Sequence, residues 1–413
     1  MKSRLHLLIC LAISCACFSC SIRPIAKPSY LDYYSEEELR EMYERARAEE
    51  LAYLQKLENS NPDSVILLNL DFTYLNSVPD LSKYNKVRIA TFSGIEANKV
   101  DKSLFLSDSL KVVTLNACSF RKIDFPEDNH IERLNLTNCQ LTHIPASVRR
   151  CKHLKDLNLE GNQIRHIPRW IMELDSLEEI SLNFNQLRLT KSDIRHLAQV
   201  NQILLGGNGI EKLPKNIGRL HCESINLAKN KIHSLPKSFA ELNQMKVLVF
   251  YENDFKEIPD VLVDFKNLRH LDFYKNHIKE IPEFVGNMEN MQQLFLSFNQ
   301  IEEIPDTLRN LKRLKYSYIH HNQLHFLPEW ITEMDSIERL GIGFNHLLTL
   351  PNLSKMKSLK DFDCEHNLLE RFPWELLERP DMEMINARNN DFNLSDDEKM
   401  RLIKASKKMN INY

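Results

Sequence analysis

The 413-residue sequence predicts an elongated solenoid of repeats rather than a set of compact domains. Three observations predict it: asparagines that recur at a step of 22 or 23 residues, a fixed apolar pattern around each of them, and prolines at one position of that pattern. A period of this length marks an array in which each unit buries its apolar face against its neighbours. The eleven asparagines are Asn162, Asn185, Asn208, Asn230, Asn253, Asn276, Asn299, Asn322, Asn345, Asn367 and Asn390.

The apolar pattern within one period predicts a short strand followed by a returning arm. Two leucine-type residues separated by one position alternate with a period of two, which is typical of a strand with one buried face. An Ile-Pro step follows, and proline suits a returning arm because its φ is fixed and it has no N–H to satisfy. In residues 291–313 the apolar positions are Met291, Leu294, Leu296, Ile301, Ile304, Leu308 and Leu311.

The unit LxxLxLxxNxLxxIPxxhxxh, with h for an apolar residue, resembles the leucine-rich-repeat family in its 23-residue, proline-containing class. The resemblance covers about fifteen units over residues 65–394. It implies an α/β solenoid with a curved, parallel sheet on the concave face, a convex face of irregular or short-helical segments, and stacked asparagines that tie each turn to the next. The units begin at Val65, Val87, Leu110, Ile131, Leu154, Leu177, Val200, Cys222, Met245, Leu268, Met291, Leu314, Ile337, Leu359 and Met382.

The N-terminus reads as an export signal. Lys2 and Arg4 precede an apolar run over residues 5–18, which is too short to cross a bilayer but suits the apolar region of a signal peptide. We therefore expect a signal peptide at residues 1–20 and a tether at residues 21–34.

A cysteine at the end of this signal resembles the lipid-attachment residue of bacterial lipoproteins. Cys20 follows Phe18 and Ser19, and Cys15 and Cys17 are alternatives. We expect an exported chain, lipid-anchored in the bacterial cell envelope at the outer membrane or facing the periplasm. An ordinary secretory signal and a secreted protein is the other interpretation.

Helices are predicted at both ends of the array, because a solenoid needs caps over its exposed ends. Ser35 and Glu38 form a capping-box pattern that opens a helix within residues 35–60. Ser395 and Glu398 repeat the pattern before a helix ending near Lys408, within residues 395–413. A membrane or partner role for the lysine-bearing C-terminal helix is the alternative to capping.

The five cysteines outside the signal occupy scaffold positions. Cys118 and Cys139 stand where other units have the asparagine, and Cys151, Cys222 and Cys364 replace core leucines. The pattern predicts buried small apolar residues rather than a disulfide framework. A bridge between Cys118 and Cys139 remains an alternative, since adjacent turns lie about 5 Å apart.

Several functional classes are disfavoured by composition and motifs. A net charge of −3 does not favour nucleic-acid binding, and nine glycines with no GxGxxG or GxxxxGK[ST] pattern argue against a nucleotide site. His320, His321 and His325 invite a metal interpretation, but His325 lies beyond the asparagine. Cys364 falls on a buried strand position and should be unreactive. We expect no enzyme activity, no metal and no cofactor.

Candidate binding residues flank the strand leucines, whose neighbours point into the concave face in this family. Units between residues 131 and 226 present an ordinary polar face, whereas the following units present aromatic, histidine and then acidic side chains. The predicted partner-binding residues are Tyr251, His270, Asp272, Tyr274, Phe295, Phe298, Tyr316, Tyr318, His320, His321, Phe344, Asp361 and Asp363.

Aromatic side chains that need not pack the core indicate an interaction surface. The alternative is cross-strand pairing that stiffens the sheet. If the face binds, we expect a protein or peptide partner held by a monomer, with a glycan as the second candidate. Open, coplanar rings beside carboxylates would favour a glycan, and interdigitated rings would favour a protein. Ser317 also replaces a core leucine in this region.

Overall fold

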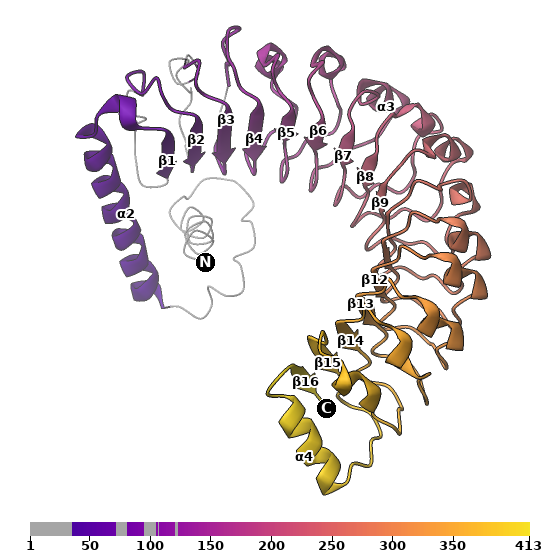
Figure 1. The fold of residues 1–413 in the computed structure, drawn as a ribbon. Helices are drawn as coiled ribbons and strands as arrows, with labels where there is room; N and C mark the ends of the chain where they lie inside the picture. The colour runs from indigo at the N-terminus through magenta and orange to yellow at the C-terminus, as the bar shows by residue number, and fades with distance from the viewer. Residues whose placement is uncertain (1–34, 72–80, 95–104, 106, 120–122) are drawn as a thin grey trace. The chain divides into compact units, whose positions relative to one another are not determined.

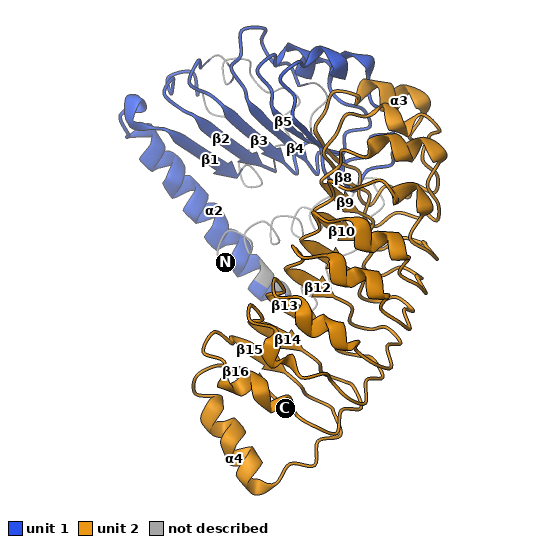
Figure 2. Ribbon diagram, turned by 45° about the vertical axis from the view of Figure 1, so that its right-hand side comes forward, with its two compact units in different colours: residues 1–186 blue, residues 187–413 orange. Residues whose placement is uncertain are grey.

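The structure, a computed structural model, describes residues 35–71, 81–94, 105, 107–119 and 123–413. The chain falls into two compact units, Met1–Gln186 and Leu187–Tyr413 (Figure 2). Both are built from short parallel strands stacked in chain order, which confirms the predicted solenoid class. The predictions for the signal peptide, the tether and Cys20 concern residues outside those described.

The strands begin where the repeat register places them. In all fifteen predicted units, the strand starts two residues after the first apolar residue of the unit. The first unit contains β1 (Leu67–Asp71), β2 (Ile89–Ser93), β3 (Val112–Asn116), β4 (Arg133–Thr137), β5 (Asp156–Asn158) and β6 (Glu179–Ser181). The second contains β7 (Gln202–Leu204), β8 (Ser224–Asn226), β9 (Val247–Val249), β10 (His270–Asp272), β11 (Gln293–Phe295), β12 (Tyr316–Tyr318), β13 (Arg339–Gly341), β14 (Asp361–Asp363), β15 (Met384–Asn386) and β16 (Asn410–Asn412).

Equivalent residues of neighbouring repeats form straight columns across the strands. His270 of β10 pairs with Gln293 of β11, which pairs with Tyr316 of β12. In the second unit the strands line the inner side of a curved array and short helical turns line its outer side (Figure 1). The outer turns of this unit are the 3-10 segments Ile217–Arg219, Lys237–Leu242, Asp260–Leu262, Glu283–Asn287, Asp306–Asn310, Glu329–Glu333, Leu353–Lys355 and Trp374–Glu378, and the helix α3 (Lys191–His196).

The regularly spaced asparagines form a ladder of buried side-chain amides. Asn276 donates from Nδ2 to the carbonyl of Phe273 at 3.1 Å and to that of Phe250, one repeat earlier, at 2.9 Å. Its Oδ1 accepts the N–H of Phe255, also in the preceding repeat, at 3.0 Å. The same three bonds recur at Asn253, Asn299, Asn322 and Asn345. Each amide thus satisfies backbone groups of two turns, as the resemblance implied.

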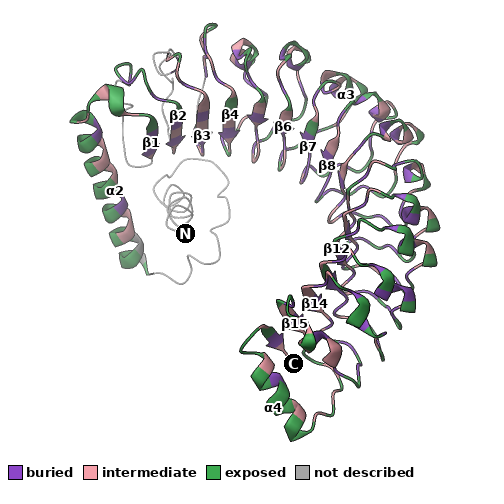
Figure 3. Ribbon diagram, viewed as in Figure 1, coloured by how far each residue is buried: buried purple, intermediate pink, exposed green. Residues whose placement is uncertain are grey.

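Phenylalanine replaces leucine in part of the second unit's core. Phe250 and Phe273 are fully buried directly after β9 and β10, with ring centroids 5.1 Å apart, and Phe255 packs 4.8 Å from Phe250. Figure 3 shows the strands as largely buried or half-buried, in contrast to the exposed outer faces of the helices. A dense aromatic core therefore lies directly beneath strands that also carry tyrosines on their outer face.

The boundary between the units coincides with a departure from the repeat. The unit containing Asn185 has no Ile-Pro step, and Thr190 and Asp193 form a capping box there that opens α3. Thr190 accepts the N–H of Asp193 at 3.3 Å, and Asp193 accepts the N–H of Thr190 at 2.8 Å. In this repeat a capped helix therefore replaces the proline-led turn.

The helix α2 (Glu36–Glu58) covers the edge of the first unit. Its capping box at Ser35 and Glu38 is formed as predicted. The Glu50 carboxylate accepts the N–H of Asp71 on β1 at 2.9 Å, and the Tyr84 hydroxyl donates to the carbonyl of Leu57 at 3.0 Å. These bonds fix the helix against the first repeats. Among the described residues, no helix combines the length and apolarity needed to cross a membrane.

The C-terminal segment differs from the predicted single helix. Ser395 and Glu398 do form a capping box, but α4 (Asp396–Ala405) is shorter than expected and is followed by β16, which pairs in parallel with β15. Leu402 and Ile411 are buried, so the chain folds back under the last repeat. The short segment Asn410–Asn412 has one apolar residue, too few for the strand period to be visible in the sequence.

None of the five cysteines within the described residues forms a disulfide, and all five are buried. Cys118 donates from Sγ to the carbonyls of Asn116 and Phe92, and Cys139 donates to those of Thr137 and Leu115. The thiols thus replace the asparagine amide as donors. The Cys118–Cys139 bridge considered as an alternative is not formed. A hydrogen bond with Cys118 instead lowers the pKa of the Cys139 thiol.

Candidate functional site

Three side chains of each repeat face away from the core of the second unit. They are the first and third strand residues and the residue two places further on, and they alternate with buried residues. Because the columns are in register, these positions form a continuous surface over β9 to β14. We call it the concave face of the second unit.

An aromatic cluster covers the middle of this face. The cluster comprises Tyr251, His270, Tyr274, Phe295, Tyr316, Tyr318 and His320, all half-buried. Tyr251 and Tyr274 meet edge to face at 5.1 Å, and His270 and Phe295 do so at 5.0 Å. Phe295 and Tyr318 are tilted at 5.2 Å. The rings therefore interdigitate across four neighbouring strands, and burial raises the pKa of Tyr251, Tyr274 and Tyr318.

A second group of rings lies just beyond the strands, in the residue that precedes each ladder asparagine. Phe298, His321, Phe344 and His366 hold this position in four successive repeats. Their ring centroids are 3.8, 3.9 and 4.0 Å apart in turn, with interplanar angles of 22°, 17° and 18°. We call these four residues the rim stack. Tyr274 contacts its first ring at 5.0 Å, which joins the stack to the aromatic cluster.

His320 is placed by a glycine on the next strand. Its ring stacks 5.6 Å from that of Tyr318 and lies over Gly341, where a Cβ atom would overlap Nε2 and Cε1 of His320. Burial lowers the pKa of His320, partly opposed by Asp363 on the far side of β13. Burial likewise lowers the pKa of His321. Both imidazoles are therefore disposed to be neutral at pH 7.

Two of the predicted acidic site residues also have a structural role. Asp272 accepts the N–H of Tyr274 at 2.8 Å, and Asp363 accepts that of Glu365 at 3.1 Å. Asn158 and Asn226 make the equivalent bond to the residue two places further on. This contact closes the end of the strand in several repeats, so one oxygen of each aspartate accepts a backbone hydrogen bond.

Beyond the rings, β14 carries three carboxylates on alternate positions of the concave face, Asp361, Asp363 and Glu365. Arg339 lies over Tyr316 with its Cζ 5.8 Å from the ring centroid, and a hydrogen bond to Tyr318 raises its pKa. Burial raises the pKa of Asp361, and Arg339 counteracts this. An acidic row therefore adjoins the aromatic cluster, with one arginine at its near end.

All thirteen predicted binding residues lie on or beside this face, and the structure adds two more. His366 completes the rim stack, and Arg339 bridges the tyrosines and Asp361. The register could have identified His366, because it precedes Asn367 as Phe344 precedes Asn345. The role of Arg339 depends on contacts across strands and has no signal in the sequence.

Other chemistry considered from the sequence has no assembled site in the described part of the chain. His325 pairs with His346 at 5.5 Å rather than with His320. No group of three or more His, Cys, Asp or Glu side chains is arranged there to hold a metal ion. Cys364 is fully buried, and burial raises the pKa of its thiol, so it is not disposed to act as a nucleophile.

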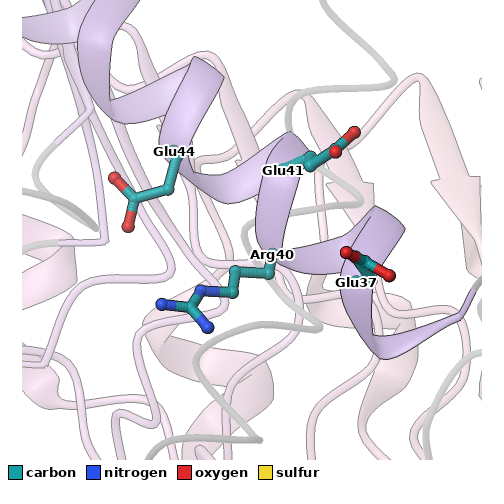
Figure 4. Close-up of a pocket in the computed structure, with 4 residues that line it drawn as sticks. All are labelled: Glu37, Arg40, Glu41 and Glu44. Carbon is teal, nitrogen blue, oxygen red and sulfur yellow. The ribbon is translucent and has the colours of Figure 1, made fainter.

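A hollow of about 590 Å³ lies beside α2 in the first unit (Figure 4). It is lined by Glu37, Arg40, Glu41 and Glu44, which all project from the same helix. Small-molecule sites are usually lined mainly by apolar side chains with a few convergent polar groups. This exposed, charged lining does not match that description.

Two family models match the sequence. One, described as a leucine-rich repeat region, matches residues 260–379, and the other, described as a leucine rich repeat, matches residues 129–187. The first match contains most of the aromatic cluster and the whole rim stack. No curated protein sequence matches this chain.

Several solved structures share the fold. A leucine-rich-repeat protein of Leptospira interrogans is 25% identical, with a TM-score of 0.70 over 86% of this chain and 97% of that one. An internalin of Listeria monocytogenes is 17% identical, with a TM-score of 0.56 over 85% and 87% of the two chains. A plant peptide hormone receptor, solved in complex with RGF2, is 23% identical, with a TM-score of 0.52 over 74% and 52%. The last two resemble this chain in fold alone.

The asparagine ladder, the parallel strands in repeat register, the two family models and the Leptospira structure agree with one another. Together they show a leucine-rich-repeat fold, with leucine-rich-repeat models matched over residues 129–187 and 260–379.

Proposed function

We propose that this chain is a non-catalytic protein-binding module that captures a protein or peptide partner on the concave face of its second unit. The observation that carries the proposal is the aromatic cluster, which continues over β9 to β12 on side chains that the core does not require. Half-exposed tyrosines and phenylalanines are the residues that dominate protein interfaces. The leucine-rich-repeat fold is itself generally used for protein interaction.

The geometry of the rings favours a protein over the glycan alternative. A sugar ring stacks on an open aromatic face, but faces in the rim stack are covered by neighbouring rings at 3.8 to 4.0 Å. In the aromatic cluster, edge-to-face contacts at 5.0 and 5.1 Å leave an uneven surface of ring edges. Such a surface suits interdigitation with apolar side chains. A peptide hormone receptor with this fold was solved in complex with RGF2, which supports a peptide or protein as the class of partner.

The test removes two rings of the cluster that are two repeats apart. We expect Tyr274→Ala combined with Tyr318→Ala to abolish partner capture while leaving the protein folded, since both side chains are half-exposed. Capture is measured by crosslinking in native extracts, followed by mass spectrometry. The matched control, Phe184→Ala with Phe326→Ala, removes two exposed rings outside the cluster and should retain the partner.

Recovery of the same partner by both variants would show that the cluster only stiffens the sheet. Circular dichroism of each variant separates loss of binding from loss of folding.

For location, we propose an exported monomer anchored in the bacterial envelope by lipid on Cys20. The support is the sequence alone: a positively charged start, an apolar run and the cysteine that ends it. Stable anchoring by acyl chains requires two or more of them.

We expect Cys20→Ala to release the protein from the membrane fraction, because the proposed lipid is attached to this thiol. The measurement is immunoblotting of membrane and soluble fractions after cell disruption. An unchanged distribution would point to Cys15, to Cys17 or to a protein without lipid, and double variants at these positions distinguish the three.

A further inference from the structure

The rim stack and two tyrosines form a narrow strip of rings across six successive repeats. The rim stack is one ring wide and advances through three successive steps of 3.8, 3.9 and 4.0 Å. Tyr274 and Tyr251 continue it at 5.0 and 5.1 Å across two more strands. Lys275 and Glu252 form an ion pair beside these tyrosines, so charge borders the strip at that end. An interface with a globular domain is broad and rounded, whereas a strip of this shape fits an extended chain.

The far end of the strip offers negative charge without a matching cation. The carboxylates of Asp363 and Glu365 form no ion pair within the described residues. The backbone N–H of Glu365 donates a hydrogen bond to Asp363. Nearby cations are engaged elsewhere: Arg339 contacts Tyr316, and Arg388 donates to Asn412 at 3.0 Å. The neighbouring histidines, His320 and His321, have lowered pKa values because of burial.

Spacing relates the aromatic cluster and the carboxylates to a partner sequence. Tyr318 on β12 and Asp363 on β14 are two strands apart, which is about 9.6 Å at the usual strand spacing. An extended chain advances about 3.3 Å per residue, so roughly three residues cover this distance. A side chain over the aromatic cluster would therefore be followed by one that reaches the carboxylates about three positions later.

Resting on the proposed function, we propose that the partner binds through an extended segment in which apolar or aromatic residues lie on the aromatic cluster and rim stack. A lysine or arginine about three residues further along lies against Asp363 and Glu365. Arginine is the better fit, since its planar guanidinium pairs with carboxylates and stacks on aromatic rings. Charge at this end selects the partner, and the rings supply most of the contact area.

The test uses a phage-displayed library of random twelve-residue peptides, selected on the immobilised full-length chain. Enriched peptides are synthesised, and their Kd values are measured by fluorescence anisotropy. We expect enrichment of sequences that carry Lys or Arg about three residues from an aromatic or aliphatic residue. The variant Asp363→Asn with Glu365→Gln, which keeps the shape and the backbone acceptor, should weaken these peptides about tenfold. Raising the ionic strength should have a similar effect.

Asp156→Asn with Glu160→Gln on β5 is the matched control, because it removes two carboxylates from the equivalent face of the first unit. It should leave the Kd unchanged. Enriched peptides without a basic residue, or equal binding by the Asp363/Glu365 variant, would overturn this inference and leave the proposed function standing. Absence of any enrichment would exclude an extended peptide as the occupant. Crosslinking with the Tyr274/Tyr318 variant tests the proposed function separately.

Discussion

The rim stack shows how much the choice of single residues matters in this array. Its four residues have φ between 50° and 57°, a conformation that bulky side chains rarely adopt. Equivalent positions elsewhere in the chain hold Gly161, Gly207 and Asn389, which tolerate it more readily, but also Phe184, Lys229, Glu252 and Lys275, with φ between 53° and 57°. Ring stacking contributes roughly 0.5–1.5 kcal/mol per pair in the rim stack. The stack therefore offsets part of a backbone cost that the repeat imposes on any side chain other than glycine at this position.

Gly341→Ala tests the placement of His320. The new Cβ atom would overlap the imidazole, so the ring should swing away from β13 towards solvent. Because burial is the main reason that the pKa of His320 is lowered, that pKa should then rise towards its ordinary value. An NMR titration of the imidazole protons measures it. An unchanged pKa would contradict the position of the ring over Gly341, and a global stability within about 1 kcal/mol of wild type is expected.

At the scale of elements, most boundaries follow from local chemistry. The capping boxes at Ser35, Thr190 and Ser395 begin α2, α3 and α4, and each proline-led turn follows an Ile-Pro or related step. The helix α2 is held to β1 by Glu50, whose carboxyl is partly buried. Burial raises the pKa of Glu50 from 4.5 to about 7, despite the hydrogen bond from Asp71. A charged Glu50 is thus unfavourable where the helix meets the sheet.

Glu50→Gln should stabilise the docking of α2 at pH 8. A raised folded-state pKa means that the folded protein prefers the protonated acid, so wild-type stability is greatest below about pH 4.5 and falls as pH rises through about 7. The amide keeps the acceptor for Asp71 without the charge. We expect a gain on the order of 1 kcal/mol at pH 8, after allowance for partial exposure, and almost none at pH 4.

Hydrogen exchange of the α2 amides at the two pH values measures this effect. Glu44→Gln, on the exposed side of the same helix, is the control. A gain of equal size at both pH values would show that the burial of Glu50 is not its cause.

At the scale of the whole molecule, stability is distributed over repeats that contact only their neighbours. The fully buried Phe250, Phe255 and Phe273 form the densest aromatic part of the core, beneath β9 and β10. Tyr251 and Tyr274, on the concave face, belong to the same repeats. A rigid core at this place holds the binding rings in position, which limits the entropy lost on capture.

Phe273→Ala should destabilise the protein by about 3–5 kcal/mol, the usual cost of removing a fully buried phenylalanine. Because repeats interact mainly with their neighbours, amide exchange should rise most in β9 to β11 and least in β1 to β4. Phe326→Ala is the control, since that ring is 50% exposed. Uniform loss of protection along the chain would contradict the nearest-neighbour view of its stability.

Much of the scaffold was predictable from the sequence because its signals are local and repeated. The spacing of Asn276 and its equivalents located the strands from β5 to β15, the apolar pattern located β1 to β4, and the role of the amide followed from the family resemblance. The two terminal capping boxes were predicted in the same way. The strand β16 was not, because three residues with one apolar side chain carry too little periodicity. The capping box at Thr190 and Asp193 was not predicted, although its sequence pattern is the same kind as that of the two terminal boxes.

The sequence by itself determined the repeat, the register and therefore which side chains lie on the concave face. Only the tertiary structure decided how those side chains meet. The edge-to-face contact of His270 with Phe295, the position of His320 over Gly341 and the closed faces of the rim stack each join residues from different repeats. The backbone pattern fixes where a Cβ atom points, but rotamers depend on the neighbouring strand, and these rotamers decide which ring faces stay open to a partner.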